Sequence, residues 1–422
     1  GAPFRRVSLC DGMLRVELAL GGDRPFVVHA RPWREGAQGW RRTGRLVLGY
    51  DGAGDPEPDA LRWLEFLHLL LSRMERSLPE GLAGFGAVAL REGRPEELLA
   101  SLFPFVTVER STPATGRRGR ARRGEQVEVL VRTTSRCNQA CPFCSAPEHS
   151  EPTTEVLRVC FRVVAELLPG ALLSLTGGEP TLRAGFLDEV RAALDALPGG
   201  QIQIQTNAVR FAGALDPAAV ATDPRLRFFV SLHALDEALY DRCTGTRRQL
   251  GKALAGIRRL RAAGHEVTLN TVVCRENVGH IEALVRGIPR AFAGGWPPAL
   301  HVSELICPEW NPRAAGSLVR YGEVVEALRR AARAARALGL ELHPLRASTH
   351  ASLPACLLSA RERARPADYR VGSHETGYED PSRPFVKAAR CRGCSETRRC
   401  LGVPQAYARA FGLDELRPIR RG

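Results

Sequence analysis

Three cysteines lie within a short stretch near residue 140. The segment R-C-N-Q-A-C-P-F-C-S, from Arg136 to Ser145, places Cys137, Cys141 and Cys144 in a C-x3-C-x2-C spacing. Iron–sulfur clusters are held by cysteine thiolates, usually four of them. Because no fourth cysteine is close in the sequence, a four-iron cluster bound here would keep one iron with an open coordination position. An open position on a metal is where chemistry takes place.

The segments on either side of these cysteines are predicted to form a strand and a helix. A β-branched run at 127–131 predicts a strand before them, and the apolar periodicity of 154–168 predicts a helix after them. A structural zinc site is the alternative interpretation of the loop. Zinc sites usually pair two C-x2-C or related units, which this loop does not do.

A second motif, Thr176-Gly177-Gly178-Glu179-Pro180, follows the next predicted strand. Together with the cysteine loop it resembles the signature of the radical S-adenosylmethionine (SAM) superfamily, in which an aromatic residue, here Phe143, commonly precedes the third cysteine. The resemblance implies a SAM-binding 4Fe–4S cluster, with Glu179 binding the methionyl ammonium of SAM. We expect the glycines to let the backbone approach a ligand closely. A plain strand-to-helix turn is the alternative.

The ends of two further strands supply polar groups. Thr206 and Asn207 end the third strand, and Ser231 ends the fourth. In relatives, such groups contact the ribose and carboxylate of SAM, so the resemblance assigns these three residues to cofactor binding. Ala208 departs from the glycine that the family often has at its position.

Three residues are candidates for contact with the substrate or for proton transfer. His233 points to the same side as Ser231, and Asn270 and Glu304 interrupt apolar strands. A hydrogen-bonded strand-end histidine is the alternative for His233. Surface exposure is the alternative for Glu304.

Strands and helices alternate from residue 126 to about 310. Strands are predicted at 127–133, 171–176, 201–206, 226–232, 266–273 and 299–305, and helices at 154–168, 183–197, 217–221, 247–263 and 278–287. This alternation predicts an α/β fold with a parallel sheet. The resemblance implies a partial (β/α)6 TIM barrel, whose chemistry lies at the carboxyl ends of the strands.

The region 1–112 has no chemical motif. Strands predicted at 13–20, 25–31 and 45–50 and helices at 60–78 and 95–102 indicate an α+β domain, which could serve substrate recognition or merely cap the barrel. An Arg/Gly-rich linker follows at 113–125. A linking helix and strand are predicted within 311–345.

A second cysteine group occupies the region 346–422. Cys356, Cys391, Cys394 and Cys400 resemble the ligands of the twitch and SPASM domains, which hold auxiliary 4Fe–4S clusters. SPASM domains continue with a further C-x3-C, but this chain has Pro404 there, so the resemblance implies one auxiliary cluster. Cys307 is a reserve fourth ligand. A four-cysteine zinc site is the alternative.

The amino-acid composition limits the partners and the cellular compartment that we expect. The net charge of +14 comes almost wholly from arginine, because the chain has only Lys252 and Lys387 as lysines. We attribute this skew to base composition and do not expect a nucleic-acid partner. Twelve cysteines without a secretory signal indicate metal sites in a reducing cytoplasm, and no apolar run is long enough to cross a membrane.

The resemblance implies reductive cleavage of SAM to a 5′-deoxyadenosyl radical that takes hydrogen from a substrate. We expect a ribosomally made peptide as the substrate. A small natural product, a sugar or RNA is the alternative, and a non-catalytic iron–sulfur carrier is the alternative of another class. An electron donor such as flavodoxin or ferredoxin is the expected protein partner.

Overall fold

The protein is described by a computed structural model. It describes residues 4–10, 13–18, 26–32, 41–43, 46–51, parts of 56–68, 99, 103, 105–111, 126–146, 151–293, 297–305, 311–342, 353–363, 369–372, 385–397, 400 and 402–420. The helices predicted at 60–78 and 95–102 lie largely outside these residues, and the predicted linker at 113–125 lies wholly outside them.

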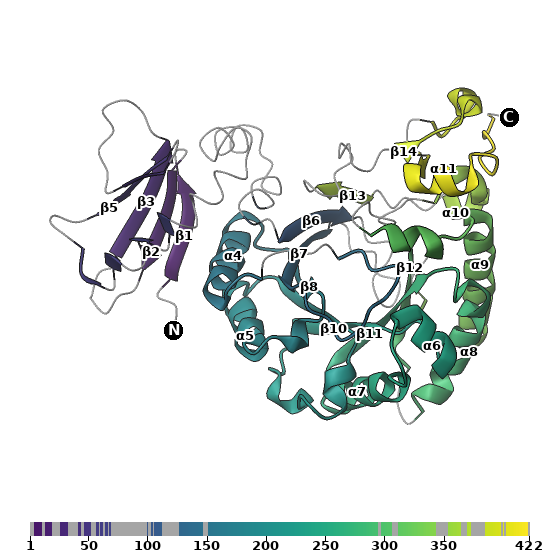
Figure 1. Ribbon diagram of the computed structural model, residues 1–422, viewed down its shortest axis with the longest axis horizontal. Coiled ribbons are helices and arrows are strands. Elements are labelled where there is room, and N and C mark those ends of the chain that lie inside the picture. The colour runs from purple at the N-terminus through teal and green to yellow at the C-terminus, as the bar shows by residue number, and fades with distance from the viewer. Residues whose placement is uncertain are drawn as a thin grey trace.

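An antiparallel sheet forms the N-terminal region (Figure 1). Its strand order is β1-β2-β3-β5-β4, with strands β1 (Phe4–Cys10), β2 (Met13–Leu18), β3 (Phe26–Pro32), β4 (Arg41–Thr43) and β5 (Leu46–Tyr50). The alternating residues Val16, Val28 and Leu48 are buried with Leu64 and Leu67 of the following segment. Strands β2, β3 and β5 match predicted strands, because each has one apolar face.

Six parallel strands form the centre of the molecule. They are β7 (Gln126–Thr134), β8 (Leu172–Gly177), β9 (Gln201–Thr206), β10 (Leu226–Ser231), β11 (Glu266–Val273) and β12 (Ala299–Glu304), and they lie side by side in chain order. Figure 1 shows the strands curving into an arc with the helices outside. The predicted mixed α/β fold with a central parallel sheet is confirmed, and each predicted strand matches an observed one to within two residues.

The crossover helices are α4 (Thr154–Leu167), α5 (Phe186–Ala196), α6 (Glu237–Thr244), α7 (Leu250–Ala262) and α8 (Ile281–Ala291). Helix α6 was not predicted. The helix predicted from residue 183 begins at Phe186, because Pro180–Leu182 forms a separate 3-10 turn, as does Pro217–Ala219 where a short helix was predicted.

Two antiparallel strands extend the sheet beyond β7. Strand β6 (Val106–Ser111) pairs with β7, and β13 (Tyr369–Gly372) pairs with β6. Strand β6 belongs to the range predicted as an N-terminal domain, and β13 to the range predicted for the auxiliary cluster. Both predicted end regions therefore contribute a strand to the central sheet.

The two faces of the central sheet differ in polarity. Alternate residues such as Val129, Leu173 and Ile204 belong to one continuous apolar core shared with the helices. The intervening positions are polar: Ser174 and Gln203 both donate hydrogen bonds to Glu128. Period-two alternation thus buries one face against helices and leaves the other for polar chemistry.

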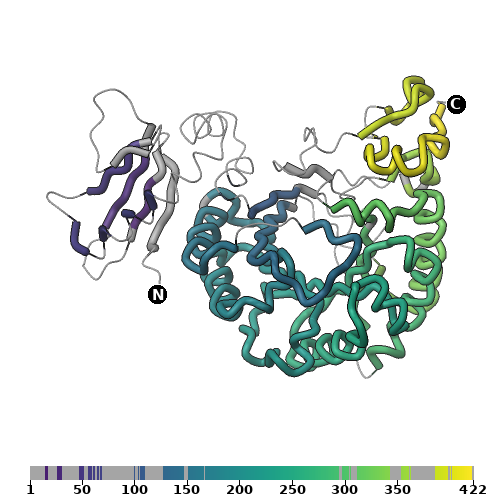
Figure 2. Tube along the Cα trace, viewed as in Figure 1, coloured from purple at the N-terminus to yellow at the C-terminus, as the bar shows by residue number. Residues whose placement is uncertain are grey.

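The C-terminal part packs on the last helices (Figures 1 and 2). A 3-10 segment, Pro312–Ser317, leads into α9 (Tyr321–Ala337), which is the linking helix predicted within 311–345. Then come the 3-10 turn Ala355–Leu357, α10 (Ala360–Arg363), β14 (Phe385–Val386), the 3-10 turn Ala389–Gly393, β15 (Val403–Pro404) and α11 (Gln405–Phe411). This part carries the second cysteine group.

Candidate active site and auxiliary cysteine site

The cysteine loop begins where β7 ends, at the carboxyl end of the parallel sheet. Cys137 and Cys144 are exposed and Cys141 is half-buried, so all three thiols lie near the surface of this end. The peptide N–H of Gln139 donates to Cys137 Sγ at 3.4 Å, and that of Cys144 donates to the carbonyl oxygen of Cys141 at 3.1 Å. The loop is therefore a compact turn that gathers three thiols.

The glycine motif fixes the start of this loop. The peptide N–H of Gly178 donates to Thr134 O at 2.6 Å, and that of Glu179 donates to Arg136 O at 2.8 Å. Gly177 has φ +127°, and a Cβ on Gly178 would lie 2.1 Å from Arg136 O. Both glycines thus let the backbone approach the chain's own cysteine loop closely, and the expected approach to a ligand stays a prediction.

Helix α6 holds the middle of the loop. Gln139 Nε2 donates to Tyr240 Oη at 2.9 Å, and the peptide N–H of Ala140 donates to Thr244 O at 2.8 Å. Gly245 ends α6 with φ +63°, and a Cβ there would lie 2.4 Å from Ala140 O. The unpredicted helix is therefore a support of the site.

Two asparagines complete the support. Asn207 Nδ2 donates to Asn138 Oδ1 at 2.6 Å, and Asn311 Nδ2 donates to the carbonyl oxygens of Pro142 and Cys144, both at 2.9 Å. Asn207 was predicted as a cofactor contact. Asn311 was missed, because no local pattern marks a residue whose partners lie so far away in sequence.

Glu179 is a buried carboxylate that joins two strand ends. Its Oε1 accepts from Thr181 N at 3.2 Å, Thr181 Oγ1 at 2.6 Å and Thr206 Oγ1 at 2.7 Å, and its Oε2 accepts from Asn207 N at 2.8 Å. Burial raises the pKa of this carboxyl, while the same hydrogen bonds lower it. Three donors share Oε1 and one binds Oε2, so the chain itself satisfies Oε1 while Oε2 keeps a lone-pair site for a further donor. Glu179 thus has a structural role whatever else it binds.

Ala208 adopts the left-handed conformation that favours glycine. Its φ is +58° and it is fully buried. This geometry explains why the family often has glycine here, and alanine pays a modest steric cost at that position. Its carbonyl oxygen would lie 2.0 Å from a Cβ on Gly256 of α7. Gly256 therefore makes room for the backbone carbonyl of residue 208.

His233 supports the aromatic residue of the cysteine loop. The rings of His233 and Phe143 meet edge to face, with centroids 5.1 Å apart, and both residues are buried. His233 Nδ1 accepts from the peptide N–H of Val272 at 3.3 Å, and burial lowers the pKa of His233 to about 4. These contacts are those of the hydrogen-bonded strand-end histidine that the sequence left as the alternative.

The remaining candidates lie on adjoining strands. Ser231 and Asn270 are paired in register on β10 and β11, and both are half-buried. Ser303 Oγ donates to Asn270 Oδ1 at 2.8 Å. Glu304 ends β12, and its side chain lies outside the described part of the structure. The structure therefore brings Ser231, Asn270 and Ser303 together on one face of the sheet.

Two thiols of the loop, those of Cys137 and Cys141, keep their protons at neutral pH when no metal is bound. Although Cys137 meets solvent, the surrounding protein raises its pKa to about 11, and burial also raises the pKa of Cys141. Metal binding must therefore release protons. Among the described side chains, no three of His, Cys, Asp or Glu are close enough together to hold a single metal ion. A donor set of thiols alone, on a support of hydrogen bonds, fits an iron–sulfur cluster.

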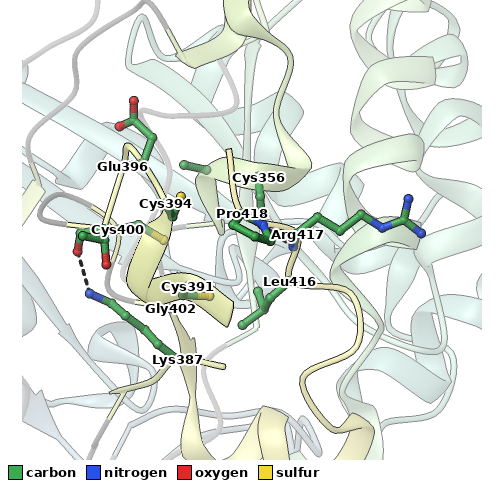
Figure 3. A pocket seen from close by; sticks show the side chains of 12 residues that line it. Cys356, Lys387, Cys391, Cys394, Glu396, Cys400, Gly402, Leu416, Arg417 and Pro418 are labelled. Atoms are coloured by element: carbon green, nitrogen blue, oxygen red, sulfur yellow. Dashed lines mark hydrogen bonds between the residues drawn. The ribbon is translucent and has the colours of Figure 1, made fainter. Parts of the chain in front are cut away.

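Four other cysteines gather in the C-terminal part (Figure 3). One hollow is lined by Cys356, Cys391, Cys394 and Cys400 together with Lys387. Cys356 comes from the turn before α10, and the other three from the segment between β14 and β15. Cys307, the reserve ligand, lies outside the described residues. The hollow thus contains the four cysteines that the sequence analysis grouped.

The thiols of this hollow receive backbone hydrogen bonds. The peptide N–H of Arg417 donates to Cys356 Sγ at 3.4 Å, and that of Ile419 donates to Cys394 Sγ at 3.3 Å. Desolvation raises the pKa of Cys356, and the N–H of Arg417 lowers it. Thiolates around one zinc at about 2.3 Å would lie within about 4 Å of one another. No group of three His, Cys, Asp or Glu side chains this tight occurs among the described residues.

Comparison with known proteins agrees with the sheet and the loop. Residues 131–288 match the radical SAM superfamily. This segment, which holds the cysteine loop, Glu179 and the strand ends around them, is therefore similar to the enzymes of that superfamily.

Relatives of different activity share this segment. The chain is 32% identical over 174 residues to GTP 3′,8-cyclase of Erythrobacter litoralis, covering 38% of this chain and 51% of the relative. It is 30% identical over 171 residues to PqqA peptide cyclase of Ruegeria pomeroyi, covering 38% and 44%. The chain thus spans about half the length of the curated relatives it matches.

A solved structure of Streptococcus suis SuiB bound to precursor peptide SuiA is 15% identical, with a TM-score of 0.42, covering 51% of this chain and 47% of that chain. No helix in the described part of the chain is long and apolar enough to span a bilayer.

Proposed function

We propose that the protein reductively cleaves SAM and uses the resulting radical to modify a ribosomally made peptide. One observation carries the proposal: the three-cysteine loop is fixed by β8, β9, α6 and Asn311 at the carboxyl end of the parallel sheet. A cluster held there would supply one-electron reduction of SAM, which would yield methionine and a 5′-deoxyadenosyl radical able to take hydrogen from the substrate.

The chain's own residues supply position and exclude water. Cys137, Cys141 and Cys144 would hold three irons, and Phe143, buried against His233, closes the underside of the loop. Ser231, Asn270 and Ser303 present polar groups to a molecule bound above the sheet. His233 acts as a positioning residue, since its Nδ1 is occupied and its imidazole is neutral at pH 7.

Cys356, Cys391, Cys394 and Cys400 would hold one auxiliary 4Fe–4S cluster. Because four thiolates leave no open iron, this cluster would accept or pass on an electron and not bind substrate directly. An electron donor such as flavodoxin or ferredoxin is proposed as the partner that reduces the enzyme.

A peptide substrate is supported by the likeness to PqqA peptide cyclase, and a nucleotide substrate is favoured by the likeness to GTP 3′,8-cyclase. One structural observation separates these classes of substrate. A peptide needs an extended recognition surface, which the N-terminal sheet β1–β5 can offer. We therefore place the peptide first and the nucleotide second.

The test uses protein reconstituted anaerobically with iron and sulfide. With a strong reductant it should convert SAM to 5′-deoxyadenosine, and replacing Cys137, Cys141 and Cys144 together by Ala should abolish the product. Cys160→Ala, a buried change on α4, is the matched control and should keep it. Undiminished 5′-deoxyadenosine from the triple variant would end the proposal. Deuterium transfer into 5′-deoxyadenosine from labelled peptide, but not from labelled GTP, would select the peptide.

A further inference from the structure

The end of the chain runs along the auxiliary hollow. Leu416, Arg417 and Pro418 line it together with the four cysteines (Figure 3). We call residues 415–419 the C-terminal strap. Two of its peptide N–H groups, of Arg417 and Ile419, point at the sulfurs of Cys356 and Cys394 at 3.4 and 3.3 Å.

The strap is held at both ends by contacts that do not involve the cysteine sulfurs. At its start, Glu415 accepts from the peptide N–H of Gly322, in the first turn of α9, at 3.1 Å, and from the Tyr407 hydroxyl. The Tyr407 ring stacks on Tyr321 with centroids 4.2 Å apart and planes at 8°. At its far end, Ile419 O accepts from Ser395 N at 2.8 Å. The two donors are thus pre-positioned.

A fixed N–H beside a thiolate changes the electrostatics of the metal it binds. Hydrogen bonds to cluster sulfurs favour the more negative, reduced state and so raise the reduction potential. Lys387 adds a cation on the wall of the same hollow, where its Nζ donates to Thr397 O at 2.7 Å. The Arg417 side chain, in contrast, points away from the hollow in Figure 3, so its contribution comes from its peptide N–H.

We propose that the C-terminal strap is part of the auxiliary site, and that the peptide N–H groups of Arg417 and Ile419 set the reduction potential of the cluster held by Cys356, Cys391, Cys394 and Cys400. This inference rests on the auxiliary cluster of the proposed function. Residues 417 and 419 are then positioning residues that act through their peptide N–H groups. The identity of their side chains should matter little.

Proline substitution removes one donor at a time. Arg417→Pro and Ile419→Pro delete the N–H groups, whereas Arg417→Ala and Ile419→Ala keep them and serve as matched controls. The midpoint potential of the auxiliary cluster, followed by EPR in a chemical redox titration of the full chain, should shift to more negative values in each proline variant. Each alanine variant should keep the native potential. Equal potentials in the proline and alanine members of a pair would overturn the proposal.

Two further measurements separate the possible failures. Iron analysis of the native chain first shows whether the auxiliary cluster exists; about four irons in place of about eight would refute the cluster itself, not only the strap. If a proline variant does not fold, amide hydrogen exchange of the native chain tests whether the two N–H groups bind the cluster's sulfur ligands. The amides of residues 417 and 419 should exchange more slowly in cluster-loaded than in cluster-free protein, and unchanged exchange would overturn the strap.

Discussion

The side-chain amide of Asn311 donates to the carbonyl oxygen of Cys144 at 2.9 Å, although 167 residues separate the two in the chain. The same amide donates to Pro142 O, and Asn311 Oδ1 accepts from Arg313 N at 3.2 Å. The segment that leads to α9 and the auxiliary cysteines is thereby fastened to the last cysteine of the first loop. This contact therefore ties the first cysteine loop to the segment that leads into α9.

Asn311→Asp tests that fastening. Aspartate keeps the acceptor for Arg313 N–H but cannot donate to the two carbonyl oxygens, so about 2 kcal/mol of loop stabilisation should be lost. We expect faster loss of the first cluster to a chelator and less 5′-deoxyadenosine, with the auxiliary cluster retained. Gln201→Glu, at the start of β9, is the control for an added charge. Native cluster retention in Asn311→Asp would mean that the amide does not hold the loop.

Glu179→Gln should weaken the junction of β8 and β9. Glutamine places an NH2 group against donors, so the free energy of unfolding without SAM should fall by about 1–3 kcal/mol. If Glu179 also binds the SAM ammonium, SAM affinity should fall about 10- to 100-fold in protein that still holds its cluster. Denaturant titration and SAM binding measure the two effects separately. Glu155→Gln, at an exposed position on α4, should change neither.

Burial of the neutral His233 imidazole should make the folded protein less stable in acid. Its folded pKa of about 4 lies below the unfolded value of 6.5, so the unfolded chain binds more protons between these values. Stability should therefore fall as the pH falls through 6.5 toward 4, by up to about 3 kcal/mol. His233→Asn should remove this part of the slope, whereas His280→Asn, at an exposed position, should leave it. Denaturant midpoints at several pH values check this, and equal slopes in all three proteins would contradict it.

Replacing Cys391, Cys394 and Cys400 together by Ala should halve the iron content. The loaded native chain should hold about eight irons and the variant about four. SAM cleavage should survive, because the first loop is untouched. Elemental analysis decides between the cluster and the alternative: one zinc per native chain at this site would replace the auxiliary cluster with a structural zinc.

Truncation tests substrate recognition by the N-terminal region. A chain starting at Gly124 loses β6 and exposes the edge of β7, so it should precipitate. A chain starting at Phe103 keeps β6 and should cleave SAM. If the N-terminal sheet recognises the substrate, this second chain should fail to modify the peptide. Unchanged turnover of peptide by it would assign the region to capping alone.

Much of the site could be predicted because its signals are local. The spacing of Cys137, Cys141 and Cys144 and the motif around Glu179 are short, and period-two apolar runs marked all six parallel strands. Helix α6 was missed although local signals exist: Asp236 caps its start by accepting from Leu239 N, and Gly245 ends it. That error was one of interpretation and not a limit of the sequence.

What the sequence alone determined is therefore the chemistry-bearing residues and the alternation of strands and helices, since both follow from neighbours in the chain. Only the tertiary structure decided which of them meet. It gave β6 and β13 to the central sheet, bound Glu179 to donors of its own chain, buried His233 against Phe143, and set Asn311 and the C-terminal strap against distant cysteines. Such contacts arise when separate elements pack, and no local periodicity encodes which distant donor meets which acceptor.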